Sequence, residues 1–201
     1  MAATVPLTKL DAVNLMLSDI GDRPVNTLTG SQRLDVTRSI STLEAVLRAF
    51  LTTGWWFNRE EGQLIVDGSG HYNVPSDWAS LEYVKGGPTQ GARRAPAPLV
   101  VRQAKLYDRH NQNFVFTGEG PVTVTFTKLL PFEDLPNAAR EYVYAAASVR
   151  NQSRALGSRH VDADLRDQAR SSLATLKAEE VDNAVEDTTF APRFLDLMHR
   201  R

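Results

Sequence analysis

Two adjacent glutamates close to two tryptophans are the residues of this chain best suited to acid–base catalysis. Glu60 and Glu61 follow Trp55 and Trp56, and glycoside cleavage uses two carboxylates with aromatic surfaces on which a sugar ring can stack. Neighbouring residues of an extended strand point to opposite faces, so these two carboxyl groups should diverge. A hydrolase would need one of them to converge with another acid, for which the candidates are Asp67, Asp77 and Glu133. The simpler interpretation is structural: aromatic side chains fill a seam between two layers and the acids meet arginines.

The other reactive groups are scattered along the chain. His160 and Asp164 have the i, i+4 spacing of metal ligands, but they stand at an expected helix start among further charges, where a solvated face is the usual outcome. There is no G-x-S-x-G for a serine nucleophile and no G-x-x-x-x-G-K for a phosphate-binding loop. We therefore expect no catalytic residue, no metal site and no cofactor.

Composition describes an ordinary globular protein. The 201 residues are 42% hydrophobic and 23% charged, and the net charge is -1, so the total charge gives no reason to expect a protein that wraps nucleic acid. The absence of cysteine excludes disulfides and thiolate metal sites. No run approaches the roughly 18 apolar residues of a membrane span, and the first residues do not resemble a signal peptide. We expect no membrane partner.

Helical periodicity is found at both ends of the chain. Thr8 can cap a first helix that Gly21 ends, and a second apolar stripe runs from residue 36 to residue 50. Pro136 stands where a third helix would begin, and that helix should run to Gly157. Ser158 can cap a fourth helix that reaches about residue 184.

Between these helices, from residue 55 to residue 130, short runs rich in β-formers alternate with glycine and proline turns. The strongest is Val122 to Leu129, in which apolar residues and threonines alternate with a period of two. The expected strands are 63–67, 71–74, 81–84, 99–102, 114–116 and 122–129. These runs predict a small antiparallel β domain.

The order of elements predicts an α+β fold. Two helices precede the β region and two follow it, so both chain ends should form one four-helix bundle with the β domain inserted. The predicted boundaries are 1–57 and 131–187 for the bundle, 58–130 for the β domain and 188–201 for a C-terminal arm.

Two segments are candidates for contact with partners. The glycine- and proline-rich stretch 86–98 is too poor in apolar side chains to pack, so it should be an exposed loop. Its Arg93 and Arg94 either contact DNA or a partner protein, or belong to a loop that is only solvated. The arm cannot bury its large apolar side chains alone, so it should dock on another surface. Those side chains are Phe190, Phe194, Leu195, Leu197 and Met198.

Three segments of the chain carry a resemblance to a known family. They are AVN at 12–14 followed by IGDRPVNTL at 20–28, GWWFNREEG at 54–62, and LLPFEDLP at 129–136. Their order and spacing are similar to those of the tail tubular protein A family, the adaptor-ring proteins of short-tailed phages. With the helix after Pro136 they cover about the first three quarters of the chain, and none of them is an enzyme signature.

The resemblance implies a structural virion protein of the phage tail that is not an enzyme. It would form a ring, expected to be a dodecamer, between the portal protein and the tail nozzle protein, tail tubular protein B. Genomic DNA would pass through the channel without sequence-specific binding, and assembly would take place in the host cytoplasm. The alternatives are a virion-associated glycan or cell-wall hydrolase using Glu60 and Glu61, and a plain nucleic-acid-binding module. The neutral net charge disfavours the nucleic-acid module.

Overall fold

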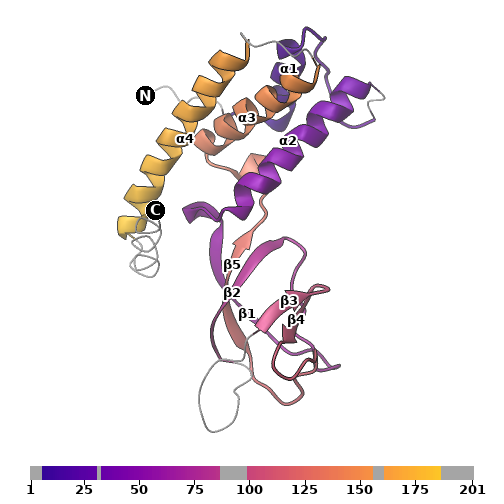
Figure 1. Ribbon diagram of the computed structural model, residues 1–201, viewed down its shortest axis with the longest axis vertical. Helices are drawn as coiled ribbons and strands as arrows, with labels where there is room; N and C mark the ends of the chain where they lie inside the picture. The colour runs from indigo at the N-terminus through magenta and orange to yellow at the C-terminus, as the bar shows by residue number, and fades with distance from the viewer. Residues whose placement is uncertain (1–5, 31–32, 87–98, 156–160, 187–201) are drawn as a thin grey trace. The chain divides into compact units, whose positions relative to one another are not determined.

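A computed structural model of the chain describes residues 6–30, 33–86, 99–155 and 161–186 (Figure 1). Four α-helices and two small antiparallel sheets make this part of the chain an α+β protein, as predicted. It divides into two compact units, one of Met1–Phe50 with Leu130–Arg201 and the other of Leu51–Leu129. The predicted contact residues Arg93 and Arg94 and the arm 188–201 lie outside the described residues.

The first helix, α1 (Lys9–Asp19), begins at a capping box. The Thr8 hydroxyl accepts a hydrogen bond from the backbone N–H of Asp11 at 3.1 Å, and the Asp11 carboxylate accepts one from the backbone N–H of Thr8 at 3.2 Å. These bonds satisfy backbone donors that a helix start leaves unpaired. Gly21, with φ at +77°, ends the helix, because only glycine adopts that angle at little cost.

The other helices of this unit are α2 (Leu34–Thr52), α3 (Asn137–Ala155) and α4 (Val161–Glu186). Helix α3 packs against both α1 and α4. Lys9 of α1 forms an ion pair with Glu44 of α2 at 2.7 Å, and the rings of Phe50 on α2 and Tyr142 on α3 lie 5.2 Å apart. The apolar stripe predicted for the second helix is confirmed, since its Val36, Leu43 and Phe50 are buried.

The other unit is built on a three-stranded antiparallel sheet in the order β1-β5-β2. Its strands are β1 (Arg59–Leu64), β2 (Trp78–Gly86) and β5 (Val122–Lys128). A two-stranded sheet pairs β3 (Leu99–Arg102) with β4 (Lys105–Asp108). In the connection between β1 and β2, a single bridge pairs Val66 with Tyr72, and a second pairs Asn73 with Lys105 of β4.

Some strand predictions for this unit were wrong. The first strand is 59–64 and not 63–67, because the polar start of β1 pairs with β5 regardless of its weak β propensity. Residues 71–74 form only single bridges, and residues 114–116 form no strand. The strand β4 was missed, since its hairpin turn consists of Gln103 and Ala104 with φ values of 52° and 55°, positions at which the usual residues are asparagine and glycine.

The core of the β unit contains a pair of stacked rings. Trp78 of β2 and Phe126 of β5 stack with centroids 3.6 Å apart and planes 5° from parallel. The rings lie over Gly62 of β1, where an added Cβ would stand 2.9 Å from Cε1 of Phe126 and 3.7 Å from the Trp78 ring. The absence of a side chain at this position is therefore what lets the Phe126 ring approach β1 so closely.

We predict that Gly62→Ala destabilises the protein by about 1–3 kcal/mol, the usual cost of forcing atoms into a packed core. Gly68→Ala is the matched control, because an added Cβ there meets nothing within 4 Å. Chemical denaturation of both variants beside the wild type measures the difference. Equal stability of the two variants would contradict the packing argument.

Candidate functional site

The first segment that carries the family resemblance contains an asparagine that binds a loop. Asn14 on α1 donates from Nδ2 to the carbonyl oxygen of Val25 at 3.0 Å and accepts at Oδ1 from the backbone N–H of Val25 at 2.8 Å. The Arg33 guanidinium also binds this loop, 2.5 Å from the Asp22 carboxylate and 3.0 Å from the carbonyl oxygen of Arg23. The loop after α1 is therefore fixed by side chains that bond its backbone.

The second segment is organised by a fully buried amide, that of Asn58. Its Oδ1 accepts from the backbone N–H of Trp55 at 2.7 Å. Its Nδ2 donates to the carbonyl oxygens of Leu51 and Lys128 at 3.0 and 2.9 Å. One side chain thus joins the end of α2, the short 3-10 turn Trp56–Asn58 and the end of β5, with all of these hydrogen-bonding groups of the amide satisfied.

Just after the third segment, an arginine on α3 donates hydrogen bonds to several backbone carbonyl groups. The Arg140 guanidinium on α3 donates to the carbonyl oxygens of Leu135 at 2.9 Å, of Leu7 at 3.1 Å, and of Glu133. Phe132 and Leu135 beside it are buried. Glu133, a candidate second acid for a hydrolase, contributes its backbone carbonyl to the arginine while its side chain is exposed.

Glu60 and Glu61 lie on β1 opposite Phe126 and Thr125, so their side chains alternate between the two faces of the sheet. The Glu60 carboxylate stands 3.7 Å from Nζ of Lys128. The predicted partner is thus a lysine and not an arginine.

Asp67, a possible second acid for a hydrolase, is engaged in a turn. It accepts hydrogen bonds from the backbone N–H groups of His71 and Ser69 and from the Asn73 amide. Those bonds, that of His71 first, lower the pKa of Asp67 to about 2. Such a carboxyl group is ionised at neutral pH and unsuited to proton donation.

Three basic residues, Arg102, Lys105 and Arg109, lie on the hairpin β3–β4 or directly after it. The Arg102 guanidinium lies 4.2 Å from the centroid of the Tyr107 ring, and that ring packs on Phe114 at 4.9 Å. Arg102 is therefore held in place by a cation–π contact. Arg109 follows β4 and is exposed, while Lys105 is half-buried.

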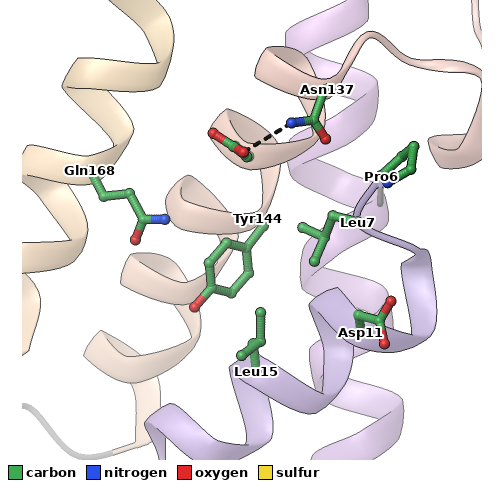
Figure 2. Close-up of a pocket in the computed structure, with 8 residues that line it drawn as sticks. Pro6, Leu7, Asp11, Leu15, Asn137, Tyr144 and Gln168 are labelled. Atoms are coloured by element: carbon green, nitrogen blue, oxygen red, sulfur yellow. Dashed lines mark hydrogen bonds between the residues drawn. The ribbon is translucent and has the colours of Figure 1, made fainter. Parts of the chain in front are cut away.

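A cleft of about 440 Å³ opens among α1, α3 and α4, and Figure 2 shows the side chains that line it. Its apolar wall is formed by Pro6, Leu7 and Leu15, and Leu15 is 42% exposed. Its polar wall consists of Asp11, Asn137, Glu141, Tyr144 and Gln168. Two acids and no basic residue are found among these lining residues, so the described wall of the cleft is acidic and partly apolar.

Sequence reasoning missed the buried polar face of α3. Ser148, Asn151 and Gln152 are all buried. Asn151 donates to the Ser39 hydroxyl of α2 at 3.1 Å, and Gln152 donates to the carbonyl oxygen of Asp19 at 2.8 Å. In the sequence A-A-A-S-V-R-N-Q-S these three positions are polar, so the apolar periodicity that marks a buried helix face does not include them.

A carboxylate and a phenol meet beside that face. Tyr144 donates to Oδ2 of Asp19 at 3.4 Å. Burial raises the pKa of Asp19, and the hydroxyls of Ser148 and Tyr144 oppose that rise. Burial and the Asp19 charge raise the pKa of Tyr144 to about 12. Both shifts disfavour negative charge here, which makes the pair a poor proton shuttle at neutral pH.

Neither a metal site nor a membrane span emerges from the described ranges. No group of three or more His, Cys, Asp or Glu side chains in residues 6–30, 33–86, 99–155 and 161–186 could hold a metal ion. Within the same ranges no helix is both long and apolar enough to cross a bilayer. The geometry is that of a structural α+β protein whose notable polar side chains bind its own backbone.

The comparisons with known proteins agree with this class. A family model described as tail tubular protein matches residues 10–185, and the chain belongs to that family. Tail tubular protein A of Klebsiella phage KP34 is 32% identical over 146 residues, which are 71% of this chain and 72% of the relative. The resemblance read from the three segments is confirmed, and the protein is a structural component of a phage tail.

We predict that Asn58→Asp destabilises the protein by about 3–5 kcal/mol at neutral pH, because a buried carboxylate would face two carbonyl oxygens without a proton to share. The loss of stability should become smaller as the pH falls. Burial raises the pKa of the introduced aspartate, so at lower pH it is protonated and can donate a hydrogen bond. Urea denaturation at pH 7 and pH 5 measures this. Asn26→Asp at an exposed position is the control, and an equal loss in both variants would contradict the role of Asn58.

We predict that Asp19→Asn stabilises the protein at pH 7 by about 0.3–1 kcal/mol, because a negative charge in the last turn of a helix is unfavourable. The raised pKa means that the folded state binds the proton more tightly than the unfolded state does, so the charge costs stability above the unfolded pKa of about 3.9. The gain should vanish below that pH. Asp35→Asn, in the first turn of α2, should not stabilise, and a less stable Asp19→Asn variant at pH 7 would contradict the prediction.

Proposed function

We propose that the protein is the adaptor of a short phage tail and forms a ring between the portal protein and the tail nozzle protein. The observation that carries this proposal is that polar side chains in or next to all three segments similar to tail tubular protein A bind backbone groups, namely those of Asn14, Asn58 and Arg140. A protein selected for a rigid shape needs such bonds, whereas a catalyst would direct some of these groups to a substrate. The ring belongs to the virion tail and is assembled in the host cytoplasm.

In the proposed ring, the four helices from both chain ends form one bundle, and bundles pack side by side around the DNA channel. The β region, residues 58–130, is the inserted domain between residues 1–57 and 131–187. Head-to-tail contacts that close on themselves give cyclic symmetry, and the number of copies expected from the family is twelve. A net charge of -1 suits a channel through which DNA slides, because strong phosphate binding would retard it.

Two regions outside the described residues supply the partner contacts in this proposal. Arg93 and Arg94 face DNA or the nozzle protein, tail tubular protein B, and touch phosphate without sequence preference. The C-terminal arm docks on a neighbouring subunit or on the portal. Its anchors are Phe190, Phe194, Leu195, Leu197 and Met198.

The protein acts in this proposal without catalysing a reaction. A glycan hydrolase using Glu60 and Glu61 gains no support from the geometry, because Glu60 pairs with Lys128 and adjacent strand residues point to opposite faces. We therefore treat both glutamates as part of the sheet surface.

The test is to mix the purified protein with the cognate portal and to examine the product by electron microscopy. We expect ring-shaped complexes with the wild type and with the Glu60→Gln/Glu61→Gln variant. Deleting residues 188–201 should abolish the complex without lowering the unfolding midpoint, since the arm is expected to contribute to partners and not to the core. A wild type that forms no ring with the portal would contradict the proposed function, and glycan cleavage lost in the Gln variant would favour the hydrolase.

A further inference from the structure

The cleft among α1, α3 and α4 has an acidic and partly apolar lining. That lining indicates the chemistry of a segment that could bind there. Leu15 is 42% exposed although it lies on α1 beside buried Met16, and Leu7 faces the same space (Figure 2). The carboxylates of Asp11 and Glu141 also line the cleft. An occupant should therefore combine large apolar side chains with positive charge.

The last residues of this same chain have that chemistry. The segment 188–201 carries five large apolar side chains, and its charged residues are three arginines against one aspartate. Arg200 and Arg201 follow the apolar run, separated from it only by His199. Apolar anchors beside a basic terminus complement a cleft with apolar and acidic walls.

The length of chain allows this segment to reach another copy. Helix α4 ends at Glu186, about 27 Å along its axis from Gln168 in the cleft. Residues 187–201 can span roughly 50 Å when extended, several times the roughly 10 Å diameter of a helix. An extended arm can thus cross from one subunit to the next.

We propose that the cleft among α1, α3 and α4 receives the segment 188–201 of a neighbouring copy, with its apolar side chains on Leu7 and Leu15 and its arginines at Asp11 and Glu141. This inference rests on the proposed ring. A head-to-tail ring requires each copy to carry two different complementary surfaces, and the arm and the cleft are such a pair.

The absence of native cysteine allows a direct test in the full-length protein. Rings of the Leu15→Cys/Leu195→Cys variant are formed with the portal under reducing conditions, checked by electron microscopy, oxidised mildly and run on a non-reducing gel. We expect a ladder of covalent oligomers. The matched control, Ala45→Cys/Leu195→Cys, places the first cysteine at an exposed position of α2 away from the cleft and should give at least tenfold less cross-linked product.

The outcomes separate this inference from the function on which it rests. Rings that yield only uncrosslinked chains, or as much product as the control, contradict the docking. A monomer cross-linked within itself shows that the arm folds onto its own cleft and also contradicts the proposal. Wild-type protein that forms no ring contradicts both the proposed function and this inference. If the wild type and the control form rings and the reduced Leu15→Cys/Leu195→Cys variant does not, the result supports the cleft as an interface.

A charge reversal gives an independent measurement. Glu141→Lys should lower the yield of rings severalfold, because it places a cation against the arginines of the arm. Arg200→Glu in the same chain should restore part of that yield. Asp164→Lys on the exposed surface of α4 is the control, and equal ring yields from Glu141→Lys and Asp164→Lys would overturn the proposed pairing.

Discussion

The bonds made by the buried amide of Asn58 are the constraint on which the β unit depends most. Three backbone groups, at the end of α2, in the turn before β1 and at the end of β5, all bind this one side chain. A buried amide or carbonyl group without a partner costs about 1–3 kcal/mol. No other side chain of similar size offers one acceptor and two donors in this arrangement, since aspartate lacks the donors and leucine lacks both. The packing of Trp78 and Phe126 on Gly62 then depends on β1 and β5 being held in this register.

Much of the fold could be predicted because its determinants are local. The Thr8 cap, the glycine at position 21 and the apolar stripe of α2 act within a few residues of each other, so periodicity and capping rules identify them. The strand 99–102 was predicted with its bounds for the same reason. The missed strand β4 and the early start of β1 depend instead on partners distant in sequence. Residues 59–61 are polar and become a strand because they pair with Thr125, Phe126 and Thr127, which no local rule anticipates.

The candidate site was less predictable, for a related physical reason. Glutamates beside tryptophans attract attention because their types suit catalysis, yet the pairing of Glu60 with Lys128 is a contact between different strands. The groups that organise the molecule, Asn14, Asn58 and Arg140, are of types that are mostly exposed in proteins. Their importance lies in bonds to backbone atoms up to 133 residues away in the chain. Sequence similarity detected the segments that contain Asn14 and Asn58 and the segment that Arg140 binds, although no physical rule had assigned these three residues a role.

The hydrogen bonds from Asn14, Asn58 and Arg140 to the backbone limit which polar groups could serve another function. Side chains that bind backbone carbonyls and amides are not available to a substrate. In the described residues these polar groups fix loops and junctions. Fixed loops lower the conformational entropy lost when a surface is bound, which favours repeated, identical contacts between copies. Although the net charge is close to zero, the charges are unevenly distributed: the cleft of the helical unit is lined by acids, and the segment 188–201 carries arginines. In the ring we propose, that distribution lets one copy attract the next in a single orientation, because a cleft does not attract a cleft and an arm does not attract an arm.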